Sequence, residues 1–373
     1  MCGYSREQAW VLVDKMHEAC PISNAILDNV YVRLAVVLTF EVSSPEMHER
    51  GESGGKEHQQ VVQLSIGADT RRDGKKGTRM STNNGHILVL GATGLNGGVD
   101  ASQLITEGLK PRLLIRAASR SKAAEFEDQA VIVEGDLEDE ASLEKAFRGI
   151  EKLYLVSANY NGSVAGRFIE ERAIDAAKMA GVVHVVKLST FKADDTELLL
   201  GQWHGSTEKH LIESGMDWTM LRPVGFHTNA LLMWAASIKA KAAFYQPTGD
   251  GRWASIDPVD IGAVAVKALT SAGHTSKIYT LTGPDSTNAA GYAAKLSAVL
   301  GKSITFIDIP PETMRAGMAA FGFPKDQVDA ALQVMASVKA NEWDIVSSDV
   351  QIVLGRAAIS FEDWATRNAA SFL

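Results

Sequence analysis

The sequence HILVLGATGLNG, at residues 86–97, constrains the fold of this chain more than any other feature. Its first part, Ile87–Leu90, is short and apolar, as expected of a strand buried on both faces. Gly91, Gly94 and Gly97 follow in the spacing G-x-x-G-x-x-G, and a helix-like segment begins directly after them. A strand that turns into a helix through glycines gathers backbone N–H groups and the positive end of a helix dipole, which suits a pyrophosphate. The pattern predicts a dinucleotide-binding turn, and the alternative is a purely structural turn. The predicted cofactor contacts in this turn are Gly91, Thr93, Gly94, Leu95, Asn96 and Gly97.

Strands and helices alternate after this turn as far as residue 223, which predicts a doubly wound parallel sheet. The predicted strands are 87–90, 111–116, 131–133, 153–156, 184–188 and 218–221. The predicted helices between them are 100–107, 123–129, 140–147, 167–180 and 206–214. Beyond residue 223 the pattern loosens, with predicted helices 229–242, 261–269, 292–300, 312–321 and 325–340 and strands 277–280 and 304–309. We therefore expect an α/β, Rossmann-type domain over 80–373, in which 224–373 contribute most of a smaller, α-rich substrate lobe.

The composition is that of an ordinary globular protein, with 46% hydrophobic residues, 22% charged residues and a formal net charge of −8. The acidic balance argues against a nucleic-acid partner. We see no apolar run long enough for a bilayer span and no signal peptide, so we expect a cytoplasmic protein without a membrane partner. Cys2 and Cys20 both precede the glycine turn, so no thiolate metal site is expected after it. A small-molecule substrate and a monomer or homodimer fit this composition.

Residues 1–79 differ from the rest of the chain. Residues 49–60 and 69–79 are polar, charged and rich in turn residues, which is typical of a linker or of disorder. Met80 stands a few residues before the first predicted strand, as the start of a dinucleotide-binding domain often does. We interpret 1–79 as an over-extended reading frame, and a genuine small N-terminal appendage is the alternative.

The residues after the second predicted strand decide which cofactor fits. An NAD site needs a carboxylate there for the ribose 2′-OH, whereas an NADP site needs positive charge for the 2′-phosphate. This chain offers Arg116, Ser119 and Arg120, and no carboxylate before Glu125. Arginine can bind a phosphate through two parallel N–H groups. The pattern favours NADPH, with NADH still possible, over the alternative of a solvated basic stretch.

Further candidate cofactor contacts follow the next strands, because ligands of open α/β sheets bind outside the carboxyl ends of the strands. Asp136 and Leu137 could hold the adenine, although an aspartate after a strand is also a common turn opener. Small and polar residues close the fourth and fifth predicted strands and could border the nicotinamide; they are Ser157, Ala158, Asn159, Ser189 and Thr190.

Taken together, these residues resemble the atypical short-chain dehydrogenases of the NmrA-like group. The resemblance is greatest to the branch of triphenylmethane reductases, NAD(P)H:quinone oxidoreductases and agroclavine-dehydrogenase-like enzymes, and it covers the chain from residue 80 to the end. The matching segments are GATGLNG (91–97), Arg116, GDL (135–137), KLST (187–190), His204–Pro223, ASIDPVDIGAVA (254–265), IYTLTGP (278–284), LGKSITF (300–306) and SFEDWATRNAASF (360–372). The resemblance implies an NAD(P)H-dependent oxidoreductase.

The chain lacks the Tyr-x-x-x-Lys pair of ordinary short-chain dehydrogenases, in which the lysine lowers the pKa of the tyrosine. Hydride transfer must therefore use another acid or none, which a quinone, azo or iminium acceptor tolerates. The resemblance places His204 near the position of a catalytic lysine in isoflavone-reductase-like relatives. His204 could act as an acid, with Glu208 one helical turn away to orient it, or could be a surface or capping residue.

We propose Ser189 and His204 as catalytic residues. The candidate substrate contacts are Tyr160, His204, Phe226 and Asn229, although Phe226 could equally be core. Asp257 and Asp260 could be mistaken for a metal pair, but we expect Asp257 to open a turn, Asp260 to cap the helix 261–269, and no metal site. The alternative to an enzyme is an NADP(H)-binding redox sensor without turnover, since fold does not determine function.

Overall fold

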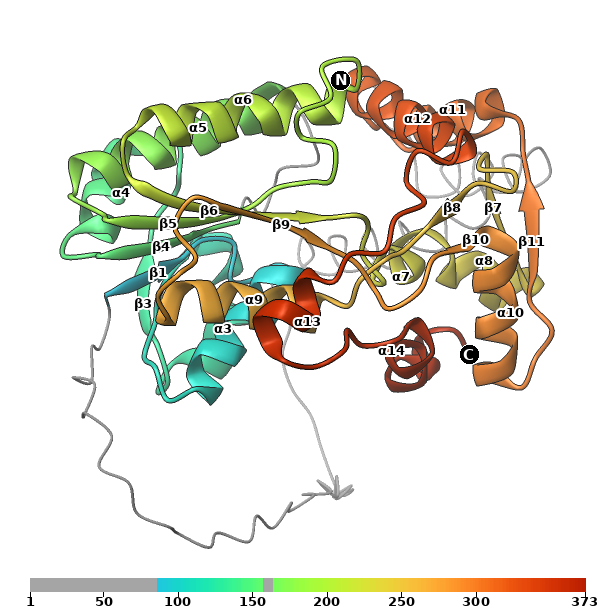
Figure 1. Cartoon of the computed structure of the whole chain (residues 1–373), viewed down its shortest axis with the longest axis horizontal. Helices are drawn as coiled ribbons and strands as arrows, with labels where there is room; N and C mark the ends of the chain where they lie inside the picture. The colour runs from blue at the N-terminus through green and yellow to red at the C-terminus, as the bar shows by residue number, and fades with distance from the viewer. Residues whose placement is uncertain (1–85, 157–163) are drawn as a thin grey trace, which may run out of the picture.

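The computed structural model describes residues 86–156 and 164–373. The expectations for 1–79 and for Ser157, Ala158, Asn159 and Tyr160 therefore lie outside the described residues. A seven-stranded parallel sheet occupies the centre, in the order β3-β2-β1-β4-β5-β6-β9 (Figure 1). Its strands are β1 Ile87–Val89, β2 Arg112–Ile115, β3 Val131–Glu134, β4 Lys152–Leu155, β5 His184–Leu188, β6 Asp217–Pro223 and β9 Lys277–Leu281. The strand order 3-2-1-4-5-6 is that of the doubly wound dinucleotide-binding fold.

Helices cover both faces of the sheet, as predicted (Figure 1). One face carries α3 (Leu95–Thr106), α9 (Pro258–Thr270) and α13 (Asp349–Leu354). The other face carries α4 (Glu140–Phe147), α5 (Val164–Met179) and α6 (Leu199–Glu213). A 3₁₀ helix, η1 (Ala117–Phe126), follows β2. Within the described residues, no helix is long and apolar enough to cross a membrane.

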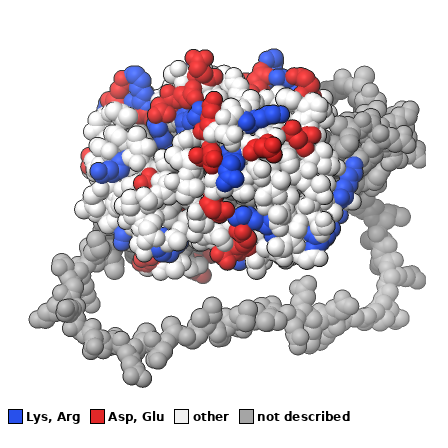
Figure 2. All heavy atoms as spheres, turned by 45° about the vertical axis from the view of Figure 1, so that its right-hand side comes forward, with Lys and Arg blue, Asp and Glu red and all other residues white. Residues whose placement is uncertain are grey.

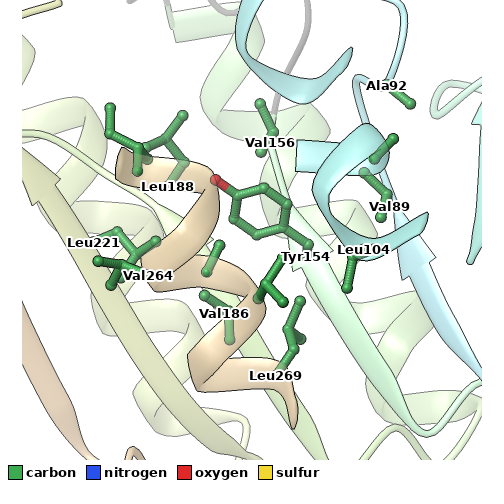
Figure 3. Close-up of a cluster of buried hydrophobic side chains, with 14 of the residues drawn as sticks. Val89, Ala92, Leu104, Tyr154, Val156, Val186, Leu188, Leu221, Val264 and Leu269 are labelled. Atoms are coloured by element: carbon green, nitrogen blue, oxygen red, sulfur yellow. The ribbon is translucent and has the colours of Figure 1, made fainter. Parts of the chain in front are cut away.

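The core beneath α3 and α9 is centred on Tyr154, a fully buried side chain of β4. Figure 3 shows its ring between Leu104 of α3 and the side of α9 that carries Val264. The two helices pack closely because α9 presents Gly262 to α3, where a Cβ atom would lie 2.4 Å from the Asp100 carboxylate. Burial raises the pKa of Asp100 well above its usual value.

The remaining elements form the predicted C-terminal lobe, at the right of Figure 1. Its helices are α7 Asn229–Met233, α8 Ala235–Lys241, α10 Ala289–Leu300, α11 Pro311–Ala320, α12 Lys325–Lys339, α14 Phe361–Arg367 and the 3₁₀ helix η2 Ala369–Ser371. Two small sheets pair β7 Ala243–Gln246 with β11 Thr305–Asp308, and β8 Arg252–Trp253 with β10 Thr287–Asn288. The lobe has its own aromatic core, in which Trp234 stacks on Phe244 at 4.2 Å between ring centroids. On the face shown in Figure 2, acidic and basic side chains are mixed and no large basic patch is visible.

Several predicted boundaries were wrong for identifiable physical reasons. Helix α6 begins at Leu199 rather than residue 206, so His204 lies within the helix and not at its start. The predicted helix 229–242 is two helices, and Ala242, with a φ of 52°, ends the second one and leads into β7. The N-cap of α9 is Asp257 rather than Asp260. The predicted ranges of α4 and β5 are confirmed residue for residue.

The loop after β5 packs against α6 through two glycines, Gly201 and Gly205. A Cβ atom at Gly205 would lie 2.2 Å from the carbonyl oxygen of Ala193, and one at Gly201 would lie 2.3 Å from that of Asp195. This loop carries Phe191, whose ring contacts the edge of Trp343 in the lobe. The two glycines thus permit the backbone approach that links the sheet edge to the lobe.

We expect Gly205→Ala to lower the free energy of unfolding by about 1–3 kcal/mol, because the added methyl group forces two backbones apart. In an open helical position the same change would raise stability by about 0.5–1 kcal/mol. Urea denaturation of the full chain measures the difference. Gly225→Ala is the matched control, since the nearest heavy atom to a Cβ there lies 3.7 Å away. Equal stability of the two variants would contradict the close approach.

Candidate active site

The turn between β1 and α3 has the geometry expected of a phosphate-binding loop. Gly91 has a φ of 69°, a conformation that glycine adopts without steric cost. The N–H of Gly94 donates to the carbonyl oxygen of Gly91 at 2.9 Å, and α3 begins at the next residue. No side chain caps the helix and its first turn contains no acidic residue. The helix start can therefore receive an anion on its backbone N–H groups, and these residues fit a dinucleotide pyrophosphate. Thr93 lies in the turn, and Leu95, Asn96 and Gly97 form the first residues of the helix.

Basic side chains follow β2, which lies beside β1 in the sheet. Arg116 is exposed and is the N-cap residue of η1, and the N–H of Ser119 donates to its carbonyl oxygen at 2.8 Å. Arg120 is half-buried and pairs with Glu127 at 2.6 Å.

Asp136, after β3, is exposed and accepts the N–H of Glu138 at 3.0 Å. The turn-opening role that the sequence left open is thus present. Leu137 packs partly against the core beneath α4 and α5. A contact of either residue with adenine stays a prediction.

Beyond β5, a carboxylate joins the ends of two neighbouring strands. Ser189 is buried and donates its hydroxyl to Glu208 of α6 at 2.5 Å. Arg222 of β6 donates to both oxygens of the same carboxylate, at 3.0 and 2.5 Å, and also pairs with Asp194 at 3.2 Å. Such a bidentate arginine–carboxylate pair fixes the orientation of both side chains and is stronger than a single hydrogen bond. Glu208 thus orients Ser189 rather than His204, which differs from the expected contact. Thr190, the next residue, is also buried.

His204 lies on α6, close to a buried ion pair of Lys187 and Glu170. The ammonium group of Lys187 lies 2.7 Å from the Glu170 carboxylate, and both side chains are fully buried. His204 is half-buried as a residue, but its Nδ1 is shielded from solvent. Burial, together with the positive charge of Lys187, lowers the pKa of His204 well below its usual value. The imidazole is therefore neutral at pH 7, which leaves it a hydrogen-bonding role and not that of a charged acid.

A cavity of about 90 Å³ opens where β6 leaves the sheet and the lobe begins. Phe226 and Asn229, two of the predicted substrate contacts, line it, whereas its lining includes neither Ser189 nor His204. Most of its wall comes from lobe residues that were not predicted as substrate contacts. These additional lining residues include Trp234, Gln246, Thr248, Trp253, Ser255, Met335, Trp343 and Phe361. They come from segments far apart in the chain, so no local pattern identifies them together. The lining contains no Lys, Arg, Asp or Glu.

His227 lines the cavity and belongs to a buried chain of hydrogen bonds. Its Nδ1 lies 2.8 Å from the hydroxyl of Ser255, which lies 2.8 Å from the hydroxyl of Tyr292. The ring of His227 also packs edge-on against Phe361. Burial lowers the pKa of His227 to about 3. This histidine is therefore a neutral structural partner at pH 7.

Two aspartates hold the C-terminal segment beside the cavity. Asp257 caps α9 by accepting the N–H of Val259 at 2.9 Å, and it also pairs with Arg367 of α14. Asp260 accepts the N–H of Ile359 at 2.6 Å and pairs with Arg356 at 2.6 Å. Both carboxylates are buried. Asp260 thus holds the residues before α14, and Asp257 holds its last residue. The first residue of α14, Phe361, is part of the cavity wall.

The glycine turn, the strand order and the cavity at the carboxyl edge define a Rossmann-type nicotinamide-dinucleotide-binding protein. Residues 91–272 match a family model described as NAD(P)H-binding. The NAD(P)H azoreductase of Xenophilus azovorans is 36% identical over 289 residues, which are 77% of this chain and 99% of that protein. The (4-alkanoyl-5-oxo-2,5-dihydrofuran-3-yl)methyl phosphate reductase of Streptomyces griseus subsp. griseus is 33% identical, over 77% of this chain and 99% of that protein. The structure of an NADPH-dependent quinone oxidoreductase from Escherichia coli, complexed with NADPH, matches with a TM-score of 0.66 and 27% identity, over 76% of this chain and 99% of that chain.

The chain belongs to the NAD(P)H-binding, NmrA-like group of atypical short-chain dehydrogenases, as its sequence predicts. It is accordingly an NAD(P)H-dependent oxidoreductase.

The buried, neutral state of His227 predicts a specific loss of stability in acid. An unfolded histidine titrates near pH 6.5, so between that pH and about 3 the unfolded chain binds one proton more than the folded chain. The free energy of unfolding therefore decreases as the pH is lowered through this window. His227 alone contributes a loss of about 2 kcal/mol between pH 6.5 and 5, at about 1.4 kcal/mol per pH unit. We expect His227→Asn, measured by urea denaturation, to lose that much less than the native chain between pH 7 and 5. Parallel pH profiles for the two proteins would refute the assignment.

Proposed function

We propose that this oxidoreductase reduces a small, uncharged, conjugated acceptor such as a quinone or an azo compound, by direct hydride transfer from NADPH. The observation that carries the proposal is the cavity at the carboxyl edge of the sheet, which is compact and lined by aromatic rings and a few neutral polar groups. Such a wall suits a flat conjugated molecule. The azo and quinone chemistry in the names of two similar proteins supports the same choice.

The chain's residues would divide the work in a simple way. Bound NADPH supplies a hydride, which carries two electrons and one proton. The glycine turn would hold the pyrophosphate, with Arg116 and Ser119 at the 2′-phosphate. Ser189 and Thr190 would border the nicotinamide at the end of β5, and Glu208 would keep the Ser189 hydroxyl oriented. His204 would act as a neutral hydrogen-bonding group, with solvent supplying the second proton that the product requires.

Charge limits the acceptor further. A buried anion needs a cationic partner or several hydrogen bonds, and the cavity lining contains no cationic side chain. Aromatic walls also exclude water, which strengthens the interactions of neutral polar groups. The cavity therefore favours a neutral acceptor over one that carries a phosphate or sulfonate group.

Turnover with matched acceptors tests this function. We expect the full chain to oxidise NADPH with 1,4-naphthoquinone and with a neutral azo dye, followed by the loss of NADPH absorbance. Its kcat/KM with 1,4-naphthoquinone-2-sulfonate should be lower by about tenfold or more, because burying an unpaired anion costs several kcal/mol. The sulfonate group makes the quinone intrinsically easier to reduce, so a lower rate would have to come from the protein. Tight NADPH binding without turnover of any quinone, azo dye, triarylmethane dye or aldehyde would instead favour a redox sensor.

Cofactor choice has a separate test in the two arginines after β2. We expect Arg116→Ala to raise the KM for NADPH by about 10- to 100-fold, the value of a charge-assisted hydrogen bond, with little change in the KM for NADH. Arg120→Ala is the matched comparison, and its effect should be smaller because Arg120 already pairs with Glu127. An equal rise for both cofactors in Arg116→Ala would show that this arginine does not read the 2′-phosphate.

A further inference from the structure

We infer that Thr248 donates a hydrogen bond to the carbonyl oxygen of the acceptor. Two consecutive hydrogen bonds, from Trp234 to Gln246 and from Gln246 to Thr248, leave the Thr248 hydroxyl as a donor. The inference rests on the proposed function and narrows its substrate class to neutral carbonyl acceptors of the quinone type. Thr248 lies in the turn between β7 and β8, and all three residues line the cavity.

The first of these hydrogen bonds comes from a tryptophan, which can only donate. The indole N–H of Trp234 has no acceptor capacity, so its 3.1 Å contact makes the Gln246 side-chain oxygen the acceptor. The orientation of the amide is thereby fixed, with its NH₂ group on the other side. That NH₂ group donates to the hydroxyl oxygen of Thr248 at 2.9 Å.

The hydroxyl of Thr248 therefore accepts from Gln246 and keeps its own hydrogen for another partner. Within the described part of the chain, Gln246 is the only residue hydrogen-bonded to this hydroxyl. The side chain is almost completely buried, and a buried donor left without an acceptor costs free energy. Because Thr248 lines the cavity, an oxygen acceptor on a bound molecule is the partner that its position offers.

The surrounding structure holds this donor in place. Trp234 stacks on Phe244, and β7 pairs with β11 along its whole length. The turn that carries Thr248 ends at Gly251, where a Cβ atom would lie 2.1 Å from the carbonyl oxygen of Val338 in α12. The turn is thus packed directly against a helix backbone. A donor fixed in this way needs little reorganisation when an acceptor binds.

Two other polar groups of the cavity do not impose this direction. Ser255 is hydrogen-bonded to both His227 and Tyr292. The amide of Asn229 can both donate and accept, so it does not select for either kind of ligand. Thr248, in contrast, favours a hydrogen-bond acceptor over a donor.

The chemistry explains why a donor matters for a quinone. Hydride from NADPH brings two electrons and one proton to the quinone and leaves NADP⁺, while negative charge develops on a carbonyl oxygen. A hydroxyl donor at that oxygen stabilises the transition state more than the ground state. Thr248 keeps its proton throughout, and solvent supplies the second proton of the hydroquinone.

Two variants of the full chain test this role, with duroquinone as the acceptor. We expect Thr248→Val, which keeps the shape and removes the hydroxyl, to lower kcat/KM by about 10- to 100-fold, mainly through kcat. Thr248→Ser retains the donor and should stay within about threefold of the native chain. The Kd for NADPH should be unchanged in both. The melting temperature should fall only in Thr248→Val, because the buried NH₂ group of Gln246 loses its acceptor there. Equal kcat/KM in Thr248→Val and the native chain would overturn the inference, as would a loss in Thr248→Val that Thr248→Ser shares.

A binding measurement separates this inference from the proposed function. Trp234, Trp253 and Trp343 line the cavity, so duroquinone binding can be followed by quenching of tryptophan fluorescence. If duroquinone binds but neither it, 1,4-naphthoquinone nor the azo dye is reduced, the proposed function fails. A Kd in Thr248→Val raised at least about threefold would still support the hydrogen bond, and an unchanged Kd would refute it. If duroquinone does not bind and none of these acceptors is reduced, both proposals fail.

Discussion

Two buried carboxylates at the start of α9 hold the lobe against the sheet. Asp257 and Asp260 lie one helical turn apart, and each pairs with an arginine of the C-terminal segment, Arg367 and Arg356. A carboxylate removed from water needs such partners, and Asp257 and Asp260 keep theirs only while the C-terminal segment stays in place. The same helix packs on α3 through Gly262, and α3 begins at the phosphate-binding turn. One helix thus connects the cofactor turn, the sheet and the wall of the cavity.

The sequence predicted best where local chemistry and tertiary structure agree. The glycine turn, α4 and β5 are such cases, because periodicity and composition there match the final burial. Prediction failed where the tertiary contact is itself the reason for the residue. Gly201 and Gly205 weaken the local helix signal of α6, yet they are required there by the loop backbone that they touch. Ala242 adopts a left-handed conformation that an alanine in a sequence does not indicate. The end of α8 and the start of β7 were therefore not predicted.

The candidate site divides along the same line. Phe226 and Asn229 follow a recognisable strand end, and both line the cavity. Their contact with a substrate stays a prediction. No local sequence pattern marks Thr248 as a site residue. Its meaning depends on Trp234 and Gln246, and on the direction of two hydrogen bonds, which require coordinates. The partners of charged side chains also could not be inferred from the sequence. Glu208 was expected to face His204, but it binds Ser189 and Arg222.

The charges of the site account for the absent Tyr-x-x-x-Lys pair. His204 and His227 are both held neutral by burial, so neither is a charged acid at pH 7. Lys187, which could have served as one, is fully buried against Glu170. In the proposed mechanism, such a site stabilises developing negative charge with neutral donors and leaves protonation to solvent. That division suits acceptors whose reduced form is a stable anion, as a hydroquinone monoanion is, and it disfavours simple aldehydes and ketones, whose alkoxides need a proton during the transfer.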